Sequence, residues 1–443
     1  MATFDANPPA GTRDFLPQAM AQREEVFATV RTTFRRHGFQ PMDTPAFERL
    51  DTLMGKYGDE GDQLIFKILR RGLEDDADHQ ELADLALRYD LTVPMARFMA
   101  RHGGVLGTPF KRYAIAPVWR ADRPQKGRFR EFVQCDVDTI GSDSMAADAD
   151  TLLAVTEALD ALGLQGWTVH LNSRRVLRGL VAAWGIPAAQ EATTLVAIDK
   201  LDKVGVDGVA GELRERGIAA DAVDALVADL GDGEPLTPVL ADAVRERLGG
   251  NDLGAAGLAE VDAVLSLVAP NLAASGRIAF SPMLARGLTY YTGPIFEIQH
   301  DGLGASIAGG GRYDGLVGMF SGQEVPATGG SLGLERVLLL LDEASDAAAP
   351  DVLVTVFDAD GRADAMAMAT SLRRAGIATD VFVADGRMKR QFKYADRRGV
   401  RFAVIRGSEE RAAGTVGVKD LASGEQSTVE FADLVSHLQR ALA

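Results

Sequence analysis

Residues 110–140 read FKRYAIAPVWRADRPQKGRFREFVQCDVDTI, and this stretch predicts two long strands joined by a loop. The segments Phe110–Arg120 and Phe129–Ile140 are rich in β-branched and aromatic side chains, which favour strands. The connection between them, Ala121–Arg128 and its flank, contains Arg, Lys, Gly and Pro. A hairpin connection of this length usually has a function.

The second strand has two chemically different faces, because successive side chains of a strand point to opposite sides of the sheet. The face that suits a hydrophobic core carries Val133, Cys135 and Val137. The opposite face is aromatic and polar, and it carries Arg130, Phe132, Gln134, Asp136 and Asp138. We predict that this face lines a pocket, where Phe132 stacks on a flat ring and Gln134 and Asp138 bind a ligand with two hydrogen-bonding nitrogens. The residues alone fit a solvent-facing sheet edge equally well.

The basic residues at the hairpin loop predict a binding site for a nucleoside triphosphate. Arg120 ends the first strand, and it is followed by Asp122, Arg123, Lys126, Arg128 and Arg130. An arginine side chain carries a planar fork of donors that matches phosphate, and it stays charged at physiological pH. A flexible basic loop without a ligand is the alternative interpretation.

Three glycine-containing segments follow later in the chain. Leu284–Gly293 (LARGLTYYTG) places one guanidinium beside two adjacent phenols. Ala308–Gly315 (AGGGRYDG) has a glycine spacing that is a weak dinucleotide signal, and the absence of a strand–helix unit around it argues against that interpretation. Ala327–Leu338 (ATGGSLGLERVL) has small residues that let a ligand approach a strand, and its helix carries Arg336. Ordinary strand–helix packing explains this last segment as well.

The net charge of −16, from 47 basic and 63 acidic residues, argues at face value against a nucleic-acid partner. The charges are unevenly distributed, however. Lys111–Arg130 holds seven basic residues and one acidic residue, and Arg387–Arg411 holds nine basic and three acidic residues. Two basic islands on an acidic chain fit local binding of polyanions. Solvated helix faces and loops are the alternative.

The composition excludes several other classes of protein. The chain has 443 residues with 47% hydrophobic and 25% charged residues, which is typical of a globular protein with two or three domains. One cysteine cannot form an internal disulfide, and the six histidines have no zinc-binding spacing. No apolar run approaches the roughly 18–20 residues of a membrane span, and no secretory signal is visible. We therefore expect a cytoplasmic protein with no membrane partner.

Sequence periodicity predicts a division of the chain into a large and a small part. Helical patterns dominate residues 172–275, between two regions of strand-like segments. The low-complexity segment Ala344–Pro350 (ASDAAAP) is the predicted linker. After it, strand and helix patterns alternate, which predicts a small α/β domain with a parallel component.

As an ordered set, these segments resemble the class II aminoacyl-tRNA synthetases, and specifically the histidyl-tRNA synthetase family. GFQPMDTP at 38–45 is similar to motif 1, WRAD to VQCDVDTIG at 119–141 to motif 2, and GGSLGLERVL at 329–338 to motif 3. These three motifs give only the class. LARGLTYYTG and AGGGRYDGL are specific to the histidine family, and LRYDLTVP at 87–94 is typical of it. The resemblance covers nearly the whole chain.

The resemblance implies a fold and an activity. The implied fold is α/β: a class II antiparallel-sheet catalytic domain with a helical insertion, plus a C-terminal α/β anticodon-binding domain. The implied boundaries are 1–171 and 276–343 for the two parts of the catalytic domain, 172–275 for the mainly helical insertion, 344–350 for the linker, and 351–443 for the anticodon-binding domain. The implied activity is ATP-dependent conversion of L-histidine to histidyl-adenylate, followed by transfer to the 3′ end of tRNA-His. A homodimer formed through motif 1 and a Mg²⁺ cofactor are implied as well.

The resemblance also assigns roles to residues of this sequence. It implies a histidine-binding set of Asp90, Thr92, Arg120, Gln134, Asp138, Arg286, Tyr290, Tyr291 and Tyr313. It implies an ATP-binding set of Arg120, Asp122, Arg128, Phe132 and Arg336. The implied catalytic residues are Arg286 and Arg120, which stabilise the pentavalent phosphorus together with Mg²⁺, and no metal is bound by protein residues alone.

Two departures from the family pattern stand out. Thr289 replaces the usual Asp of the segment Arg-Gly-Leu-Asp-Tyr-Tyr, and we expect it to change hydrogen bonding around the site without loss of activity. Asp122 stands where class II enzymes often carry Glu. The competing interpretation is a histidine-sensing regulatory subunit of ATP phosphoribosyltransferase, a paralogue that lacks the anticodon-binding domain and degrades the Arg-Gly-Leu-x-Tyr-Tyr segment. A tRNA-binding module without catalysis is a third possibility.

The implied role of Arg286 gives a first testable prediction. The substitution Arg286→Ala should largely preserve the binding of histidine and ATP, but it should slow adenylate formation severely, because a donor to the developing phosphoryl charge is lost. Single-turnover adenylation measures this effect, with equilibrium binding of both substrates as the control. An unchanged single-turnover rate would contradict the role.

Overall fold

The computed structural model describes residues 4–72, 82–230, 238–274, 276–285, 290–341, 349–384 and 386–442. The chain separates into two compact units. The larger unit comprises Met1–Asp14 and Arg23–Asp342, and the smaller unit comprises Phe15–Gln22 and Glu343–Ala443. The division near residue 342 lies beside the linker predicted at 344–350. The boundaries of the functional domains given by the sequence stay predictions.

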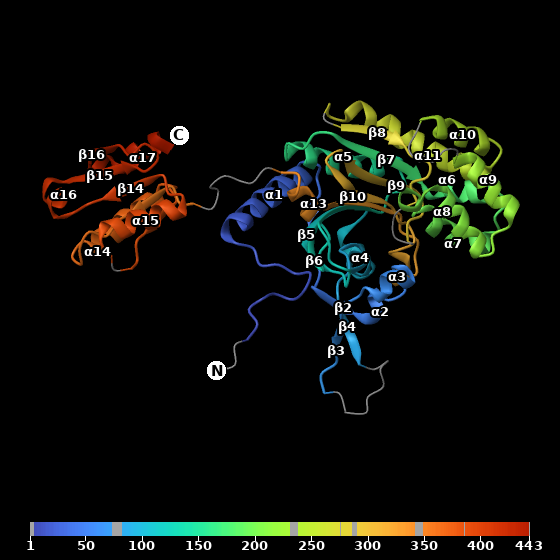
Figure 1. Cartoon of the computed structure of the whole chain (residues 1–443), viewed down its shortest axis with the longest axis horizontal. Helices are drawn as coiled ribbons and strands as arrows, with labels where there is room; N and C mark the ends of the chain where they lie inside the picture. The colour runs from blue at the N-terminus through green and yellow to red at the C-terminus, as the bar shows by residue number, and fades with distance from the viewer. Residues whose placement is uncertain are drawn as a thin grey trace. The chain divides into compact units, whose positions relative to one another are not determined.

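The larger unit is built on a mixed, mainly antiparallel sheet (Figure 1). In the described part of the chain this sheet has eight strands in the order β1-β5-β6-β11-β10-β9-β7-β8. Only the two edge strands pair in parallel with their neighbours. In sheet order the strands are β1 (Gln40–Pro41), β5 (Phe110–Trp119), β6 (Glu131–Ile140), β11 (Ala327–Gly333), β10 (Leu303–Arg312), β9 (Pro294–His300), β7 (Trp167–Ser173) and β8 (Gly276–Phe280).

The two strands predicted from residues 110–140 form the hairpin β5–β6, whose ten residue pairs run from Phe110↔Ile140 to Trp119↔Glu131. Cys135 and Val137 of β6 are fully buried in the hydrophobic core, as the predicted alternation requires. This core also holds α5 (Met145–Ala161) and one face of α1 (Pro17–Arg36). The free thiol of Cys135 is buried there, and burial raises its pKa.

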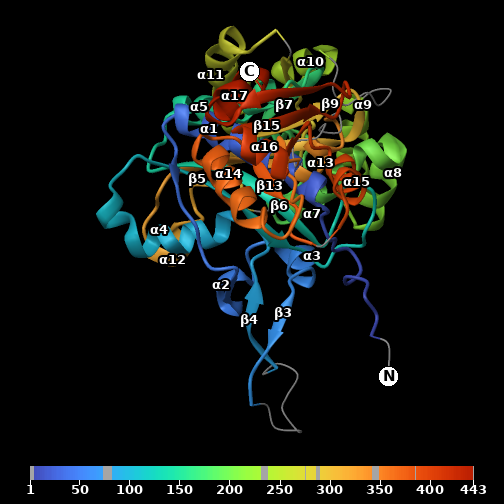
Figure 2. The same cartoon turned by 90° about the vertical axis from the view of Figure 1, so that its left-hand side faces the viewer.

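A small three-stranded sheet precedes the main hairpin and positions the start of a helix. Its strands lie in the order β2 (Phe47–Arg49), β4 (Ala83–Leu87) and β3 (Lys67–Leu69), and β3 lies beside β4 in both views (Figure 2). The composition of residues 64–68 (LIFKI) and 86–89 predicts strands, and these segments overlap β3 and β4 with ends that differ by one to three residues. The short helices α2 (Leu50–Leu53) and α12 (Gly318–Ser321) pack against α4 (Thr92–Leu106), and α3 (Gly58–Gln63) follows α2 along the chain.

The segment between β7 and β8 is helical, as its periodicity predicts. It contains α6 (Arg174–Ala183), α7 (Glu191–Ile198), α8 (Leu201–Glu215), α9 (Ala220–Leu230), α10 (Pro238–Leu248) and α11 (Asp252–Val268). Glycines let α6 and α11 approach closely. A Cβ atom on Gly179 would lie 2.7 Å from the Cα atom of Gly254, and one on Gly257 would lie 2.5 Å from the backbone nitrogen of Val176.

One helix in the described part of the chain meets the length and hydropathy expected of a membrane span. The segment Asp252–Asn271 has a mean hydropathy of 1.5. The acidic residues Glu260 and Asp262 interrupt its apolar sequence. The Ser173 hydroxyl donates a hydrogen bond to Glu260, and Arg245 pairs with Asp262. These contacts and the packing of α11 on α6 fit a helix of a folded domain. Such helices can meet the same length and hydropathy criteria as a membrane span.

The smaller unit has a five-stranded sheet in the order β13-β12-β14-β15-β16. The predicted alternation accounts for β12 (Val352–Val354), α14 (Arg362–Arg374), β13 (Thr379–Val381), α15 (Met388–Arg398) and β14 (Phe402–Ile405). The strand β12 pairs in parallel with both neighbours, as expected. The predicted alternation ends at β14 and does not extend to α16 (Ser408–Ala413), β15 (Thr415–Asp420), β16 (Gln426–Glu430) or α17 (Leu434–Leu442).

Candidate active site

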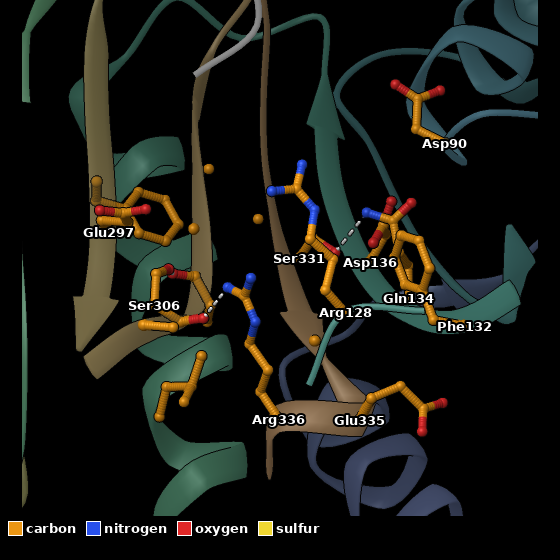
Figure 3. Close-up of a pocket in the computed structure, with 18 of the residues that line it drawn as sticks. Asp90, Arg128, Phe132, Gln134, Asp136, Glu297, Ser306, Ser331, Glu335 and Arg336 are labelled. Atoms are coloured by element: carbon orange, nitrogen blue, oxygen red, sulfur yellow. Dashed lines mark hydrogen bonds between the residues drawn. The ribbon is translucent and has the colours of Figure 1, made fainter. Parts of the chain in front are cut away.

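The larger unit contains a cavity of about 690 Å³. Its lining comes from β6, β9, β10 and β11, from the loop after β5, and from the start of α4 (Figure 3). The aromatic and polar face of β6 therefore lines a pocket, which excludes the alternative of a solvent-facing sheet edge.

Asp90 stands immediately before α4 and is 1% exposed. Its carboxylate accepts hydrogen bonds from the Tyr57 hydroxyl and from the backbone nitrogen of Val93, both at 3.0 Å. The Tyr290 hydroxyl lies 3.5 Å from its second oxygen. Burial raises the pKa of Asp90, against the opposing effect of the Val93 hydrogen bond. The Asp90 carboxyl thus connects the start of α4 to the tyrosines in the wall of the cavity. Thr92, in the first turn of α4, also lines the cavity.

Three tyrosines form an aromatic cluster in this wall. The ring centroids of Tyr290 and Tyr291 are 5.1 Å apart, and Tyr313 lies 5.8 Å and 6.5 Å from them. Burial raises the pKa of all three hydroxyls, so they remain protonated donors at neutral pH. Such a cluster suits a flat ring that carries hydrogen-bonding nitrogens.

Asp138 is paired with a fully buried cation. Its carboxylate lies 2.7 Å from the guanidinium of Arg112, whose side chain is 0% exposed. Arg112 also donates to the carbonyl of Leu91 at 3.1 Å, and the Tyr313 hydroxyl donates to Asp138. Burial raises the pKa of Asp138, while Arg112 opposes the shift. Only glycine fits opposite this pair, because a Cβ atom on Gly329 would lie 2.0 Å from an Asp138 oxygen.

Gln134 and Asp136 lie between Phe132 and Asp138 on the same face of β6. The Gln134 amide donates to the Ser331 hydroxyl at 3.0 Å, as the dashed line in Figure 3 marks. Asp136 is 2% exposed, and burial raises its pKa to about 7, while Arg112 acts in the opposite direction.

Arg120 follows β5 directly, and its guanidinium lies between two aromatic rings. The guanidinium carbon lies 4.2 Å from the centroid of the Tyr89 ring and 5.1 Å from that of Phe132. The Arg120 Nε atom donates to the Tyr89 carbonyl at 3.0 Å. Stacking and this hydrogen bond hold a permanent positive charge at the cavity wall.

The loop after β5 is ordered by its own charges. The buried Asp122 carboxylate accepts a hydrogen bond from Arg128 at 2.9 Å, and its backbone carbonyl accepts one from Arg130 at 3.1 Å. The backbones of Gln125 and Arg128 bond to each other in both directions, at 3.1 and 2.9 Å. Gly127 completes this tight turn with a φ of 73°, which favours glycine. These contacts hold the segment in a defined turn.

The helix α13 (Leu334–Leu338) carries two neighbouring charges that point in different directions (Figure 3). The Arg336 guanidinium reaches the backbone carbonyl of Ser306 across the cavity. The Glu335 carboxylate accepts two hydrogen bonds from Arg23, at 2.9 and 2.8 Å, and another from Arg13. These arginines come from the N-terminal arm and α1, so both segments are tied to the helix that presents Arg336.

The described part of the cavity brings together twelve of the thirteen residues singled out in the sequence. They are Asp90, Thr92, Arg120, Asp122, Arg128, Phe132, Gln134, Asp138, Tyr290, Tyr291, Tyr313 and Arg336. The thirteenth, Arg286, lies outside the described residues, as does Thr289.

Arg112, which is buried against Asp138, and three residues that line the cavity received no role from the sequence. Arg112 could have been found from the hairpin register, which places it opposite Asp138. Asp136 was placed on the polar face of the strand, but no role was assigned to it. Asp199 and Lys203 reach the cavity from the helical insertion, and no local pattern marks them.

Among the described residues, no cluster of three or more His, Cys, Asp or Glu side chains could hold a metal ion. Magnesium usually binds through one or two carboxylates together with substrate phosphates, so the cavity fits this ion only as a companion of a bound triphosphate.

Comparison with known proteins agrees with this geometry. Residues 11–337 match the model of histidyl-tRNA synthetase, and residues 351–441 match an anticodon binding domain. The chain belongs to the histidyl-tRNA synthetase family. The histidine–tRNA ligase of Cytophaga hutchinsonii is 40% identical over 451 residues, which cover 97% of this chain and 98% of the relative. That of Leifsonia xyli is 45% identical over 365 residues, covering 79% and 83% of the two chains.

Solved structures of the histidyl-tRNA synthetase family share the fold. The crystal structure of histidyl-tRNA synthetase from a Nostoc species has a TM-score of 0.82 and 30% identity, with 99% of this chain and all of that chain covered. A Bacillus halodurans structure described as an ATP phosphoribosyltransferase regulatory subunit/histidyl-tRNA synthetase has a TM-score of 0.72 at 20% identity, with coverage of 89% and 97%. At that identity the likeness shows the fold alone.

The Glu335 cluster gives a prediction on stability. Glu335→Gln should lower the free energy of unfolding of the larger unit by about 3–5 kcal/mol at pH 7, because Arg23 stays buried without its anion. Although burial opposes the shift, the hydrogen bonds from Arg23 and Arg13 lower the pKa of Glu335. The stabilisation is therefore present above the ordinary glutamate pKa and is lost as pH falls through the lowered one.

Tryptophan fluorescence measures this effect in one unit, since all three tryptophans, Trp119, Trp167 and Trp184, belong to the larger unit. The matched control is Glu324→Gln on an exposed loop, which should leave the unfolding midpoint unchanged. Equal midpoints for the Glu335 and Glu324 variants at pH 7 would contradict the prediction.

Proposed function

We propose that this chain is a histidine–tRNA ligase, which activates L-histidine with ATP and transfers the histidyl group to the 3′ end of tRNA-His. The observation that carries the proposal is the lining of a single cavity. Its carboxyl and tyrosine residues suit a small cation with a polar ring, and its arginines lie around the same space and suit a triphosphate.

The proposed histidine site is the group of residues around the tyrosine cluster. Asp90 and Thr92 bind the ammonium side of the substrate, and Gln134 and Asp138 contact its polar groups. Tyr290, Tyr291 and Tyr313 surround the imidazole. Burial raises the pKa of each tyrosine hydroxyl, which keeps all three protonated and able to donate hydrogen bonds.

The proposed ATP site lies along β6, the loop after β5, and α13. Phe132 and Arg336 enclose the adenine from two sides, with Asp122 near its amino group. Arg128 and Arg336 bind the outer phosphates. In this proposal Arg128 exchanges its 2.9 Å contact with Asp122 for a phosphate, which ATP binding would favour because Arg128 is half-exposed.

The reaction needs no protein nucleophile. The histidine carboxylate attacks the α-phosphorus of ATP in line, which forms histidyl-adenylate and releases pyrophosphate. A ribose hydroxyl at the tRNA 3′ end then takes the histidyl group and releases AMP. Arg120, held between Tyr89 and Phe132, is placed to bind the α-phosphate and the substrate carboxylate. Together with Arg286 it stabilises the charge that develops at phosphorus.

Magnesium is a proposed cofactor that enters with ATP. When bound, it neutralises charge on the phosphate oxygens. The residues of this chain then orient the nucleotide. We further propose a cytoplasmic homodimer whose subunits meet through residues 38–45, as the family resemblance implies.

The proposed anticodon-binding surface belongs to the smaller unit. At the carboxyl ends of β12 and β13 lies a cavity of about 230 Å³ with apolar residues and Arg362 in its wall. Phe357 is 55% exposed there and Val383 is 85% exposed, so both can contact a base. The helix α15 adds exposed basic side chains, among them Lys389, Lys393 and Arg397. Spaced four residues apart, these three share one helix face that can meet phosphates.

Histidine-dependent exchange of pyrophosphate with ATP tests the proposed function directly. The wild-type chain should catalyse exchange with L-histidine, and it should charge purified tRNA-His. A chain that binds histidine or tRNA but catalyses no exchange would instead be a regulatory subunit or a tRNA-binding module, and the proposal would be wrong.

The basic face of α15 gives a separate prediction. Lys393→Glu should raise the KM for tRNA and reduce the salt dependence of tRNA binding by about one phosphate contact, because a cation near the backbone is replaced by an anion. Histidine-dependent exchange should be unchanged. Arg440→Glu, the same change of charge on α17, is the control and should leave both measurements near wild type. An unaltered KM for tRNA in Lys393→Glu would remove α15 from the tRNA surface.

A further inference from the structure

The carboxyl of Asp136 is a second acidic group in the floor of the cavity. It lies in β6 between Gln134 and Asp138, and strand pairing places it opposite Ser331 of β11. Its residue is 2% exposed, yet it lines the cavity. Figure 3 shows it next to Gln134, on the wall that faces the cavity.

Two buried oxygen atoms at this point have no hydrogen-bond partner among the described residues: Oδ1 of Asp136 and Oε1 of Gln134. Gln134 is nevertheless fixed, because its amide nitrogen donates to the Ser331 hydroxyl at 3.0 Å. A buried acceptor without a donor costs free energy, and a native protein usually supplies the donor. Ser331 also hydrogen-bonds the Asp136 carboxylate. Two acceptors that still lack a donor on one face of β6, in a ligand cavity, indicate that the ligand supplies the donor.

The charges around Asp136 leave it without a cation of its own. No Lys, Arg or His nitrogen of the described residues lies within 4 Å of its carboxylate. Arg112 contacts Asp138 at 2.7 Å through one nitrogen, and its Nε and Nη1 atoms have no hydrogen-bond partner among the described residues. The other titratable groups that act on Asp136 or respond to it are Asp138 on β6, Asp90 before α4, Tyr291 before β9, and Cys135 on the opposite face of β6. None of these groups offers a positive charge.

We propose that the ionised carboxylate of Asp136 accepts a hydrogen bond from a nitrogen–hydrogen donor of the amino-acid substrate and is thereby a specificity-determining residue. This inference rests on the proposed function of the cavity. It adds to the implied histidine-binding set a residue for which the resemblance implies no role. A substrate with a carboxylate or an apolar group at this position would leave the buried acceptor unpaired and would be rejected.

The environment of Asp136 makes substrate binding proton-linked. Burial raises the pKa of Asp136 to about 7, against the effect of Arg112, so part of the free protein carries a proton there at neutral pH. A donor that binds the ionised form lowers this pKa and expels the proton. Histidine affinity should therefore rise between pH 6 and pH 8, and binding near pH 7 should release protons.

Isothermal titration of the full chain with L-histidine at pH 6, 7 and 8, in phosphate and in Tris, measures affinity and proton release together. Asp136→Asn should weaken binding by roughly tenfold or more at pH 8, since a charge-assisted hydrogen bond is lost, and it should abolish proton release at pH 7. The matched control is Asp143→Asn, which removes an exposed carboxylate just after β6 and should behave like wild type. The KM for ATP should be unchanged in both variants.

Imidazolepropionate, which lacks the ammonium group, separates the two possible donors. If Asp136→Asn also weakens its binding, the imidazole is the donor; if the variant and the wild type bind it equally while histidine binding differs, the ammonium is the donor. A variant that binds histidine with wild-type affinity and wild-type proton release would overturn the inference while the proposed function stands. A wild-type chain that does not bind histidine would refute both.

Discussion

The buried pair of Arg112 and Asp138 is the interaction on which the tyrosine-lined end of the cavity depends. Two charges are removed from water here, and this arrangement is stable only when their remaining hydrogen-bonding groups are also satisfied. Tyr313 donates to the carboxylate, and the carbonyl of Leu91 accepts from the guanidinium, but the Nε and Nη1 atoms of Arg112 are buried without a hydrogen-bond partner among the described residues. The pair also requires glycine at position 329, so β5, β6 and β11 must keep their register. A slip by one residue would turn the whole polar face of β6 into the core.

The opposite end of the cavity holds positive charge by a different physical means. Arg120 is stacked between aromatic rings, Arg128 is paired with Asp122, and Arg336 extends from a helix whose neighbouring Glu335 is bound to α1 and the N-terminal arm. Each cation is therefore oriented before a ligand arrives. A chain with a net charge of −16 thus gathers three arginines around one cavity.

Much of the architecture could be predicted because its signals are local. Alternation along residues 129–140 identified the core face and the pocket face of β6, and the strand–helix alternation after residue 351 identified a parallel component. The boundaries of β3 and β4 were shifted because short strands are defined by pairing with distant segments and not by their own composition. The strands β15 and β16 of the smaller unit were missed because they have few of the apolar residues that mark buried strands.

The sequence by itself determined which side chains share a face of a strand and which segments carry arginine, glycine and tyrosine, because strand periodicity and residue chemistry are properties of neighbouring positions. Only the tertiary structure decided that Arg112 would neutralise Asp138, that Glu335 would bind the N-terminal arm, and that Asp136 would be buried with no cation of the described residues in contact with it. These outcomes depend on the distance between residues far apart in the chain and on the exclusion of water between them. Neither the distance nor the exclusion of water can be read from the order of the amino acids, because both are set only when the strands have paired.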